Sequence, residues 1–210
     1  RGLGDVYKRQ LLSEGKAKDT IYVTGNTAID ALKTTVRQEY THPELEWAKE
    51  SRLIMLTAHR RENLGEPLHH MFRAIKRIVD ETPDIKVIYP IHMNPVVRQA
   101  AEEILGGDEK IHIIEPLDVL DFHNFLSRSY LILTDSGGIQ EEAPSLGKPV
   151  LVMRDTTERP EGIAAGTLKL VGTNEDTIYQ EFRRLLSDET AYAEMSQANN
   201  PYGDGFLSLI

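Results

Sequence analysis

Short apolar runs alternate with longer amphipathic segments along most of this chain. The short runs are rich in β-branched residues, and they predict strands at residues 20–24, 53–57, 86–89, 110–114, 130–134, 149–152 and 168–171. Apolar positions recur with a helical period at residues 27–37, 67–81, 95–105, 119–127, 138–146, 176–186 and 189–198. Strands that are apolar on both faces and alternate with helices predict an α/β fold with a doubly wound parallel sheet.

Composition and charge exclude several classes of protein. With 40% apolar and 27% charged residues among 210, the chain is expected to bury one domain-sized core. The net charge of −9 argues against nucleic acid as a partner. We find no cysteine, no signal-peptide core and no apolar run of membrane-spanning length, so we expect a cytoplasmic protein without a membrane partner. The histidines lack i,i+4 spacing and no Asp-x-Asp pair occurs, so no metal site is expected.

The segment after the predicted strand at residues 130–134 carries the clearest chemical signal. Asp135, Ser136, Gly137 and Gly138 lead directly into a helix, which places backbone N–H groups and a positive helix end at the ligand edge of a parallel sheet. The two glycines let a phosphate approach the backbone, and the Ser136 hydroxyl adds a donor. This segment is a candidate phosphate site, and the alternative is an ordinary tight turn with a Ser or Asp helix cap.

A carboxylate lies one helical turn beyond the candidate phosphate site. Glu142 follows Gly138 by four residues, so its side chain returns to the same side of the helix. There it is placed to accept both hydroxyls of a ribose, and the alternative is a solvated carboxylate on the helix face. Glu141 points about 100° away, so we expect it at the surface or with a partner elsewhere.

A second loop at this edge is rich in cationic side chains. His59, Arg60 and Arg61 directly follow the strand predicted at residues 53–57. Guanidinium donors suit diphosphate oxygens, and an imidazole can donate to phosphate or exchange a proton near neutral pH. The alternative is a solvated loop whose arginines pair with Glu62 and Glu66.

Three further residues are candidates for which a structural role is the alternative. His92 follows another predicted strand, and Phe122 is an aromatic at helical spacing that can stack on a base or fill the core. Arg159 lies in a charged segment from which it can reach back to the serine–glycine loop. In the same segment Arg154 and Asp155 are expected to pair.

Five motifs, in this order along the chain, carry a resemblance to a known family. They are Val23-Thr24-Gly25-Asn26-Thr27, Thr57-Ala58-His59-Arg60-Arg61-Glu62-Asn63, Tyr89-Pro90-Ile91-His92-Met93-Asn94-Pro95, the run at residues 131–160, and Asn200-Pro201-Tyr202-Gly203-Asp204-Gly205. Together they resemble the non-hydrolysing UDP-N-acetylglucosamine 2-epimerases. Members of that family have two Rossmann-like domains in a GT-B-like arrangement, and this chain resembles the C-terminal, UDP-binding domain.

The resemblance implies an isomerase that interconverts UDP-GlcNAc and UDP-ManNAc. In the family, UDP is eliminated to give 2-acetamidoglucal and is then re-added, without a redox cofactor or a metal. By this likeness His59 contacts the diphosphate and takes part in catalysis. The resemblance also implies that Ser136, Gly137 and Gly138 hold phosphate and that Glu142 holds the ribose.

The same likeness assigns four more residues. It implies that Phe122 lies by the uracil and that Arg159 is another ligand contact. Arg60 and His92 resemble residues of an allosteric UDP-GlcNAc site in the bacterial enzymes. Where some members have Gln beside the uracil, this chain has Leu117, so only a backbone contact is expected there.

The resemblance also divides the chain. We expect a scar or ragged end at residues 1–10, the UDP-binding domain at residues 11–205 and a tail at residues 206–210 that departs from the family's continuing helix. The family's acid and base carboxylates belong to its N-terminal domain, so we expect this chain to be inactive alone. For the full-length enzyme the likeness implies a cytoplasmic homodimer that binds UDP-GlcNAc, UDP-ManNAc and UDP and supplies polysaccharide biosynthesis.

Two other functions fit the same residues. A UDP-sugar glycosyltransferase of GT-B fold would use the serine–glycine loop and Glu142 equally well, although the segments at residues 59–63 and 155–160 argue against it. A non-catalytic UDP-sugar sensor is the alternative from another class. The hydrolysing relatives of the epimerases also stay open.

Overall fold

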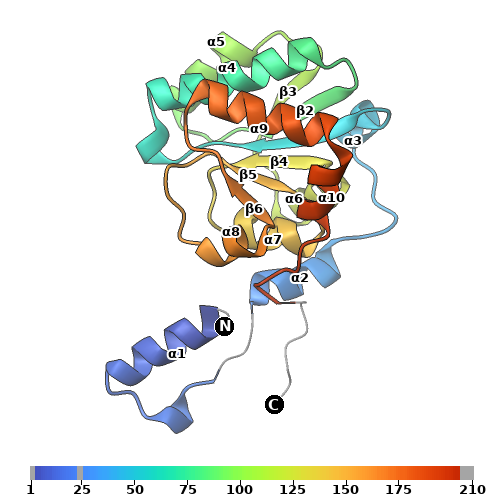
Figure 1. The fold of residues 1–210 in the computed structure, drawn as a ribbon. Coiled ribbons are helices and arrows are strands. Elements are labelled where there is room, and N and C mark those ends of the chain that lie inside the picture. Colours follow the sequence, from blue (N-terminus) through green and yellow to red (C-terminus); the bar gives the residue numbers. More distant parts are fainter. Residues whose placement is uncertain (1–2, 23–25, 204–210) are drawn as a thin grey trace.

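Six parallel strands form one sheet in the structure, a computed structural model that describes residues 3–22 and 26–203. The strands are β1 (Arg52–Thr57), β2 (Ile85–Pro90), β3 (Ile111–Ile114), β4 (Leu131–Thr134), β5 (Val150–Val152) and β6 (Leu168–Leu170). Their order is β3-β2-β1-β4-β5-β6 (Figure 1). The chain therefore builds half of the sheet outward from β1 and the other half outward from β4, which is the Rossmann-like, doubly wound order.

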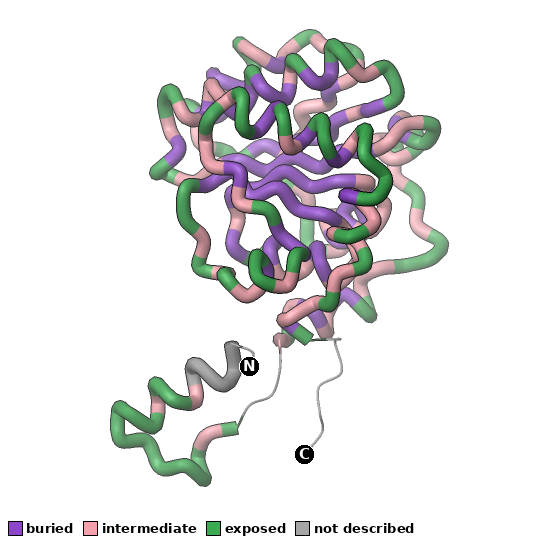
Figure 2. The backbone as a smooth tube through the Cα atoms, in the orientation of Figure 1, coloured by how far each residue is buried: buried purple, intermediate pink, exposed green. Residues whose placement is uncertain are grey.

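The alternation of side chains along each strand explains why both faces are covered. In β1, Ile54 and Leu56 belong to one hydrophobic cluster, whereas Leu53 and Met55 belong to the other. The strand is buried almost throughout, and Figure 2 shows the sheet as the buried centre of the molecule. Because β1 pairs in parallel with both β2 and β4, the ends of these three strands meet at one edge.

Two layers of helices cover the sheet (Figure 1). One face is packed by α4 (Glu66–Glu81), α5 (Pro95–Leu105), α9 (Glu175–Ser187) and α10 (Glu189–Ser196). The other face is packed by α3 (Pro43–Ala48), α6 (Val119–Arg128) and α7 (Ile139–Ser145), and α2 (Thr27–Thr35) lies on α6 and α7. The short helix α8 (Pro160–Ala165) contacts β6. The predicted fold class is confirmed.

The N-terminal segment differs from its prediction. Instead of a strand at residues 20–24, the chain forms a 3₁₀ turn, η1 (Lys18–Thr20), and Tyr22 is 75% exposed; residues 23 and 24 lie outside the described residues. A strand needs a neighbour to pair with, and this segment lies away from the edge strands of the sheet, β3 and β6 (Figure 1). A helix, α1 (Leu3–Ser13), runs across the boundary drawn at residue 10, and Figure 1 shows it apart from the sheet.

Candidate functional site

A pocket of about 630 Å³ opens at the carboxyl ends of the strands. Six residues predicted from the sequence line it: His59, His92, Phe122, Ser136, Gly138 and Glu142. They come from the segments that follow β1, β2, β3 and β4, so the strand order brings together residues that are far apart in the sequence. Leu117 adds an apolar side chain to the wall. Phe122 lines the pocket and also packs against the core, and its stacking on a base stays a prediction.

The helix after the serine–glycine loop begins without a side-chain cap. Its N-cap is Gly138, with φ −65° and ψ −43°, and no described side chain bonds there, so the alternative of a Ser or Asp cap is wrong. Neither Gly137 nor Gly138 has a positive φ, so glycine provides space here rather than conformational freedom. A Cβ on Gly137 would lie 3.4 Å from Arg60 Nη2, and one on Gly138 would lie 3.8 Å from Glu142 Oε1.

Glu142 lies in the pocket wall with little solvent around it. Its side chain is 17% exposed, and Oε2 lies 3.8 Å from Nε2 of His123. Burial, followed by the charge of Glu141, raises the pKa of Glu142. Burial also lowers the pKa of His123, whose Nδ1 shares a 2.7 Å hydrogen bond with Thr35 Oγ1, and so favours the neutral ring. The carboxylate is therefore suited to accept hydrogen bonds from neutral donors such as hydroxyl groups.

Arg159 directly precedes α8, and its side chain reaches Glu141 of α7 instead of the serine–glycine loop. Its Nε donates to Glu141 Oε1, and Asn26 Nδ2 donates to Glu141 Oε2 at 2.5 Å. Glu141 thus has its partners elsewhere, as its helical position predicted. In this structure the guanidinium of Arg159 bonds to Glu141 and not to the loop, and its contact with a ligand stays a prediction.

The two imidazoles predicted as site residues face each other. The rings of His59 and His92 are nearly parallel, with an interplanar angle of 10° and centroids 5.3 Å apart. Nδ1 of His92 accepts from the backbone N–H of Asn94 at 3.1 Å, which fixes this ring in its loop. Because Nδ1 accepts, a neutral His92 ring carries its proton on Nε2.

Arg60 connects the β1 loop to the β4 loop. Its Nε donates to the carbonyl oxygen of Asp135 at 3.2 Å, and its guanidinium lies beside Gly137. Among the glutamates expected to pair with the loop arginines, Glu66 pairs with Arg73 of α4 at 3.5 Å. The solvated-loop alternative therefore does not describe Arg60.

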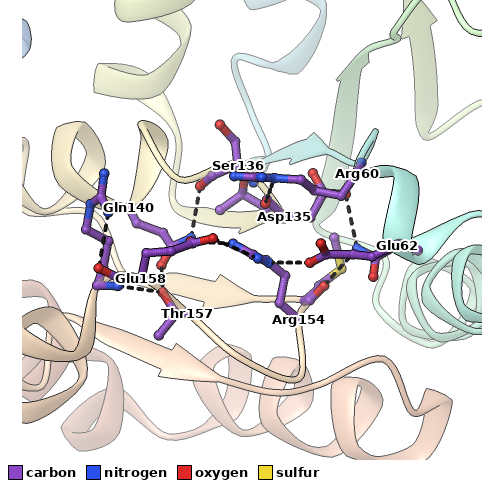
Figure 3. Close-up of polar contacts among 12 residues, drawn as sticks. Arg60, Glu62, Asp135, Ser136, Gln140, Arg154, Thr157 and Glu158 are labelled. Carbon is purple, nitrogen blue, oxygen red and sulfur yellow. Dashed lines mark hydrogen bonds and ion pairs between the residues drawn. The ribbon is translucent and has the colours of Figure 1, made fainter.

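A buried arginine ties the β5 loop to the β1 loop (Figure 3). Arg154 is 4% exposed, and it donates to Glu62 at 2.8 Å and to Glu158 at 2.6 and 3.0 Å. The hydrogen bonds from Arg154 lower the pKa of Glu158 to about 2. The sequence predicted that Arg154 pairs with Asp155, and this prediction is wrong, because Arg154 pairs with Glu62 and Glu158.

A second bridge joins the β5 loop to the serine–glycine loop. Gln140 Nε2 donates to the carbonyl oxygen of Ser136 at 3.1 Å, and its Oε1 accepts from Thr157 Oγ1 at 2.5 Å (Figure 3). The three loops at this edge of the sheet are therefore held to one another by buried and half-buried hydrogen bonds. Such a scaffold holds a site in place before a ligand arrives.

The sequence did not single out three residues of this site. His123 lines the pocket, Gln140 links two loops, and Asp135 is fully buried beside His59. His123 directly follows Phe122, and Asp135 precedes Ser136, but their partners depend on the strand order. Within the ranges that the structure describes, no three His, Asp or Glu side chains are grouped as a metal site requires. None of the described helices is both long and apolar enough to cross a membrane.

Comparison with known proteins identifies the family. A family model described as UDP-N-acetylglucosamine 2-epimerase matches residues 4–208. UDP-N-acetylglucosamine 2-epimerase of Bacillus subtilis (strain 168) is 64% identical over 201 residues, which cover 96% of this chain and 53% of that protein. The structure of S. aureus MnaA with UDP has a TM-score of 0.90 at 55% identity and covers 96% of this chain and 55% of that chain.

A further solved structure contains the nucleotide sugar. UDP-GlcNAc 2-epimerase from Neisseria meningitidis bound to UDP-GlcNAc has a TM-score of 0.84 at 42% identity, covering 96% of this chain and 56% of that chain. The chain thus spans about half the length of the relatives that it matches. The resemblance found in the motifs is confirmed, and the chain belongs to the UDP-N-acetylglucosamine 2-epimerase family.

Proposed function

We propose that this chain is the nucleotide-binding half of an enzyme that interconverts UDP-GlcNAc and UDP-ManNAc. The observation that carries the proposal is the pocket, because it collects a glycine-rich helix start, a buried carboxylate and an aromatic ring in one wall. These are the groups that a diphosphate, a ribose and a base require. Relatives with 42% and 55% identity bind UDP-GlcNAc and UDP.

Each part of UDP has a candidate partner in the pocket. The backbone at Ser136, Gly137 and Gly138 would hold the diphosphate, where the glycines leave room and α7 presents its N-terminus. Glu142 would accept the ribose hydroxyls, and Phe122 would lie against the uracil. These roles agree with the depth of Glu142 in the wall and with the apolar surroundings of Phe122.

Two positions would act at the sugar side of the nucleotide. His59 would contact the diphosphate and donate to it as UDP departs, because a protonated imidazole stabilises the developing charge. Arg159 would reach the ligand only after its hydrogen bond to Glu141 is exchanged. Arg60 and His92 would contact a second, regulatory UDP-GlcNAc molecule, as their likeness to the bacterial enzymes implies.

The elimination needs a base at C2 of the sugar. Glu142 is the one carboxylate among the described residues that line the pocket, and its proposed task is to hold the ribose. We therefore propose that the carboxylates that act as acid and base at the sugar lie outside these 210 residues, in the half of the relatives that the chain does not match.

Other proposals rest on the family alone. They are the UDP-ManNAc product, its use in polysaccharide biosynthesis, and a cytoplasmic homodimer for the complete enzyme. The division into a ragged end at residues 1–10, a domain at residues 11–205 and a tail at residues 206–210 also stays a prediction.

Calorimetric titration of the chain with UDP tests the proposal. Replacing Glu142 by Ala removes hydrogen bonds to a charged acceptor, each of which contributes about 1.5–3 kcal/mol, so we expect UDP to bind about 10- to 100-fold more weakly. Glu103, an exposed glutamate of α5, provides the matched control, and Glu103→Ala should bind as the parent does. If the parent binds no UDP, the proposed function is wrong, and equal affinity in parent and Glu142→Ala would remove the ribose role.

A further inference from the structure

Asp135, at the end of β4, is a buried carboxylate with no role in the proposed function so far. Its side chain is fully buried. Oδ2 accepts three hydrogen bonds, from the backbone N–H groups of His59 and Arg60, both at 2.8 Å, and from Asn63 Nδ2 at 3.2 Å. This oxygen therefore fixes the course of the β1 loop, and the carboxylate cannot rotate without losing three donors.

The second oxygen of Asp135 has a different environment. Oδ1 is buried and makes no hydrogen bond to any described residue, but it lies 3.4 Å from Nδ1 of the His59 ring. A buried carboxylate oxygen without a donor costs free energy, so a small rotation of the His59 ring that brings its Nδ1–H into range is favoured. Hydrogen bonds at catalytic groups are often long in the absence of ligand and shorten when it binds.

We propose that Asp135 is a positioning residue that holds the His59 imidazole with its proton on Nδ1 and leaves Nε2 for the pocket. For the task of Nε2 the inference rests on the proposed function, in which this nitrogen, protonated from solvent, donates a hydrogen bond to the departing diphosphate. One carboxylate thus holds both the backbone and the ring of His59. A neutral imidazole carries its proton on one nitrogen, and the partner of the other nitrogen decides which one.

The geometry predicts what an amide does at this position. In Asp135→Asn the side-chain oxygen has to stay where Oδ2 is, because three donors point there. The new NH₂ group then replaces Oδ1 and faces Nδ1 of His59. A donor in that place needs an acceptor, so the imidazole proton moves to Nε2. The substitution keeps the loop and reverses the tautomer.

Nitrogen NMR of the chain labelled with ¹⁵N-histidine tests the inference directly. Spectra are recorded without UDP in mildly alkaline solution, where an ordinary imidazole is neutral. The His59 signals are assigned by their loss in His59→Gln. We expect a protonated Nδ1 and an unprotonated Nε2 in the parent, and the reverse in Asp135→Asn. Glu62→Gln is the matched control. It removes a carboxylate of the same loop, but this carboxylate bonds to Arg154 and not to His59, so the variant should keep the parent's tautomer.

Two results would overturn the inference: a proton on Nε2 of His59 in the parent, or one tautomer shared by the parent and Asp135→Asn. The parent's spectrum is decisive even if Asp135→Asn does not fold. A titration of the same parent sample with UDP separates this inference from the proposed function. A protonated Nδ1 in a chain that binds no UDP would support the positioning by Asp135 and contradict the function.

Discussion

The charged form of the buried Glu142 destabilises the free protein, and the proposed ligand would offset this effect. Its raised pKa means that the folded state holds the proton more tightly than the unfolded state. The free fold therefore gains stability from this group at low pH and loses it as the pH rises through the raised pKa. Ribose hydroxyls that donate to the carboxylate favour its charged form. Binding and the stability of the free fold thus oppose each other at this residue.

At the serine–glycine loop, a single added methyl group should raise the stability of the free chain and lower its affinity for the ligand. Gly138 has helical backbone angles, and a Cβ there would be 3.8 Å from Glu142, an ordinary contact. We expect Gly138→Ala to stabilise the free chain by about 0.4–1 kcal/mol, because alanine restricts the unfolded state. The same methyl group occupies the approach of the phosphate, so UDP should bind at least about 10-fold more weakly. Thermal unfolding and calorimetric titration measure the two effects.

The control for this substitution is a glycine outside the pocket. Gly166 has a φ of 81° at the end of α8, where alanine is strained. Gly166→Ala should therefore destabilise the chain and leave the UDP affinity of the folded protein unchanged. Parent-like UDP affinity in Gly138→Ala would show that no phosphate approaches this backbone.

Helical periodicity alone predicted which way the α7 carboxylates point. Glu142 lines the pocket and Glu141 faces Arg159, as positions 100° apart require. The partners of Arg159 and Asp135 were not predictable in this way. Arg159 meets Glu141 because β5 pairs with β4, and Asp135 meets His59 because β4 pairs with β1; a single sequence does not show these pairings.

Among the elements, those with the most regular patterns were predicted best. The amphipathic helix α5 has the predicted bounds, whereas the helices α1, α3 and α8 were missed. Both α3 and α8 have only six residues and begin with a proline, and the polar residues around α8 are typical of a loop. Residues 20–22 show that a β-branched run forms a strand only where it lies beside an edge of a sheet.

The loops at the ligand edge depend on the buried pairing of Arg154. The planar guanidinium of Arg154 donates to Glu62 and Glu158 from different nitrogens, and a lysine ammonium cannot reproduce this geometry. Both glutamates are more than half exposed, so solvent screening limits each pair to about 1 kcal/mol or less. We expect Arg154→Lys to lower Tm by about 2–4 °C at neutral pH.

The dependence of this effect on pH identifies its source. Because the pKa of Glu158 falls from 4.5 to about 2 in the fold, its stabilisation is present above pH 4.5 and is lost as the pH falls toward 2. The difference in Tm between the parent and Arg154→Lys should shrink over that range. Arg184→Lys, an exposed pair with Glu181, should change stability by about 0.5 kcal/mol or less at any pH. A difference that stays constant down to pH 2 would assign the effect to packing instead of charge.

At the scale of the molecule, the doubly wound order creates the pocket. The chain leaves the middle of the sheet in opposite directions after β1 and after β4, so the loops behind these strands diverge and open a crevice between them. Alternating strands and helices predicted this architecture, and the motifs predicted its chemistry. The lining carries one carboxylate among the described residues, which limits what these 210 residues can do alone.

We expect the isolated chain to bind UDP-GlcNAc without epimerising it. Its pocket can hold the nucleotide and stabilise departing diphosphate, but it offers no second carboxylate, among the described residues, to take the proton from C2. General acid–base groups contribute about 10²–10⁴-fold to such a step. Long incubation with UDP-GlcNAc followed by chromatographic separation from UDP-ManNAc is the measurement, with a full-length relative as the positive control. UDP-ManNAc formed by the isolated chain at the relative's rate would mean that a group of this pocket acts as the base. If that group is Glu142, a different residue would have to hold the ribose.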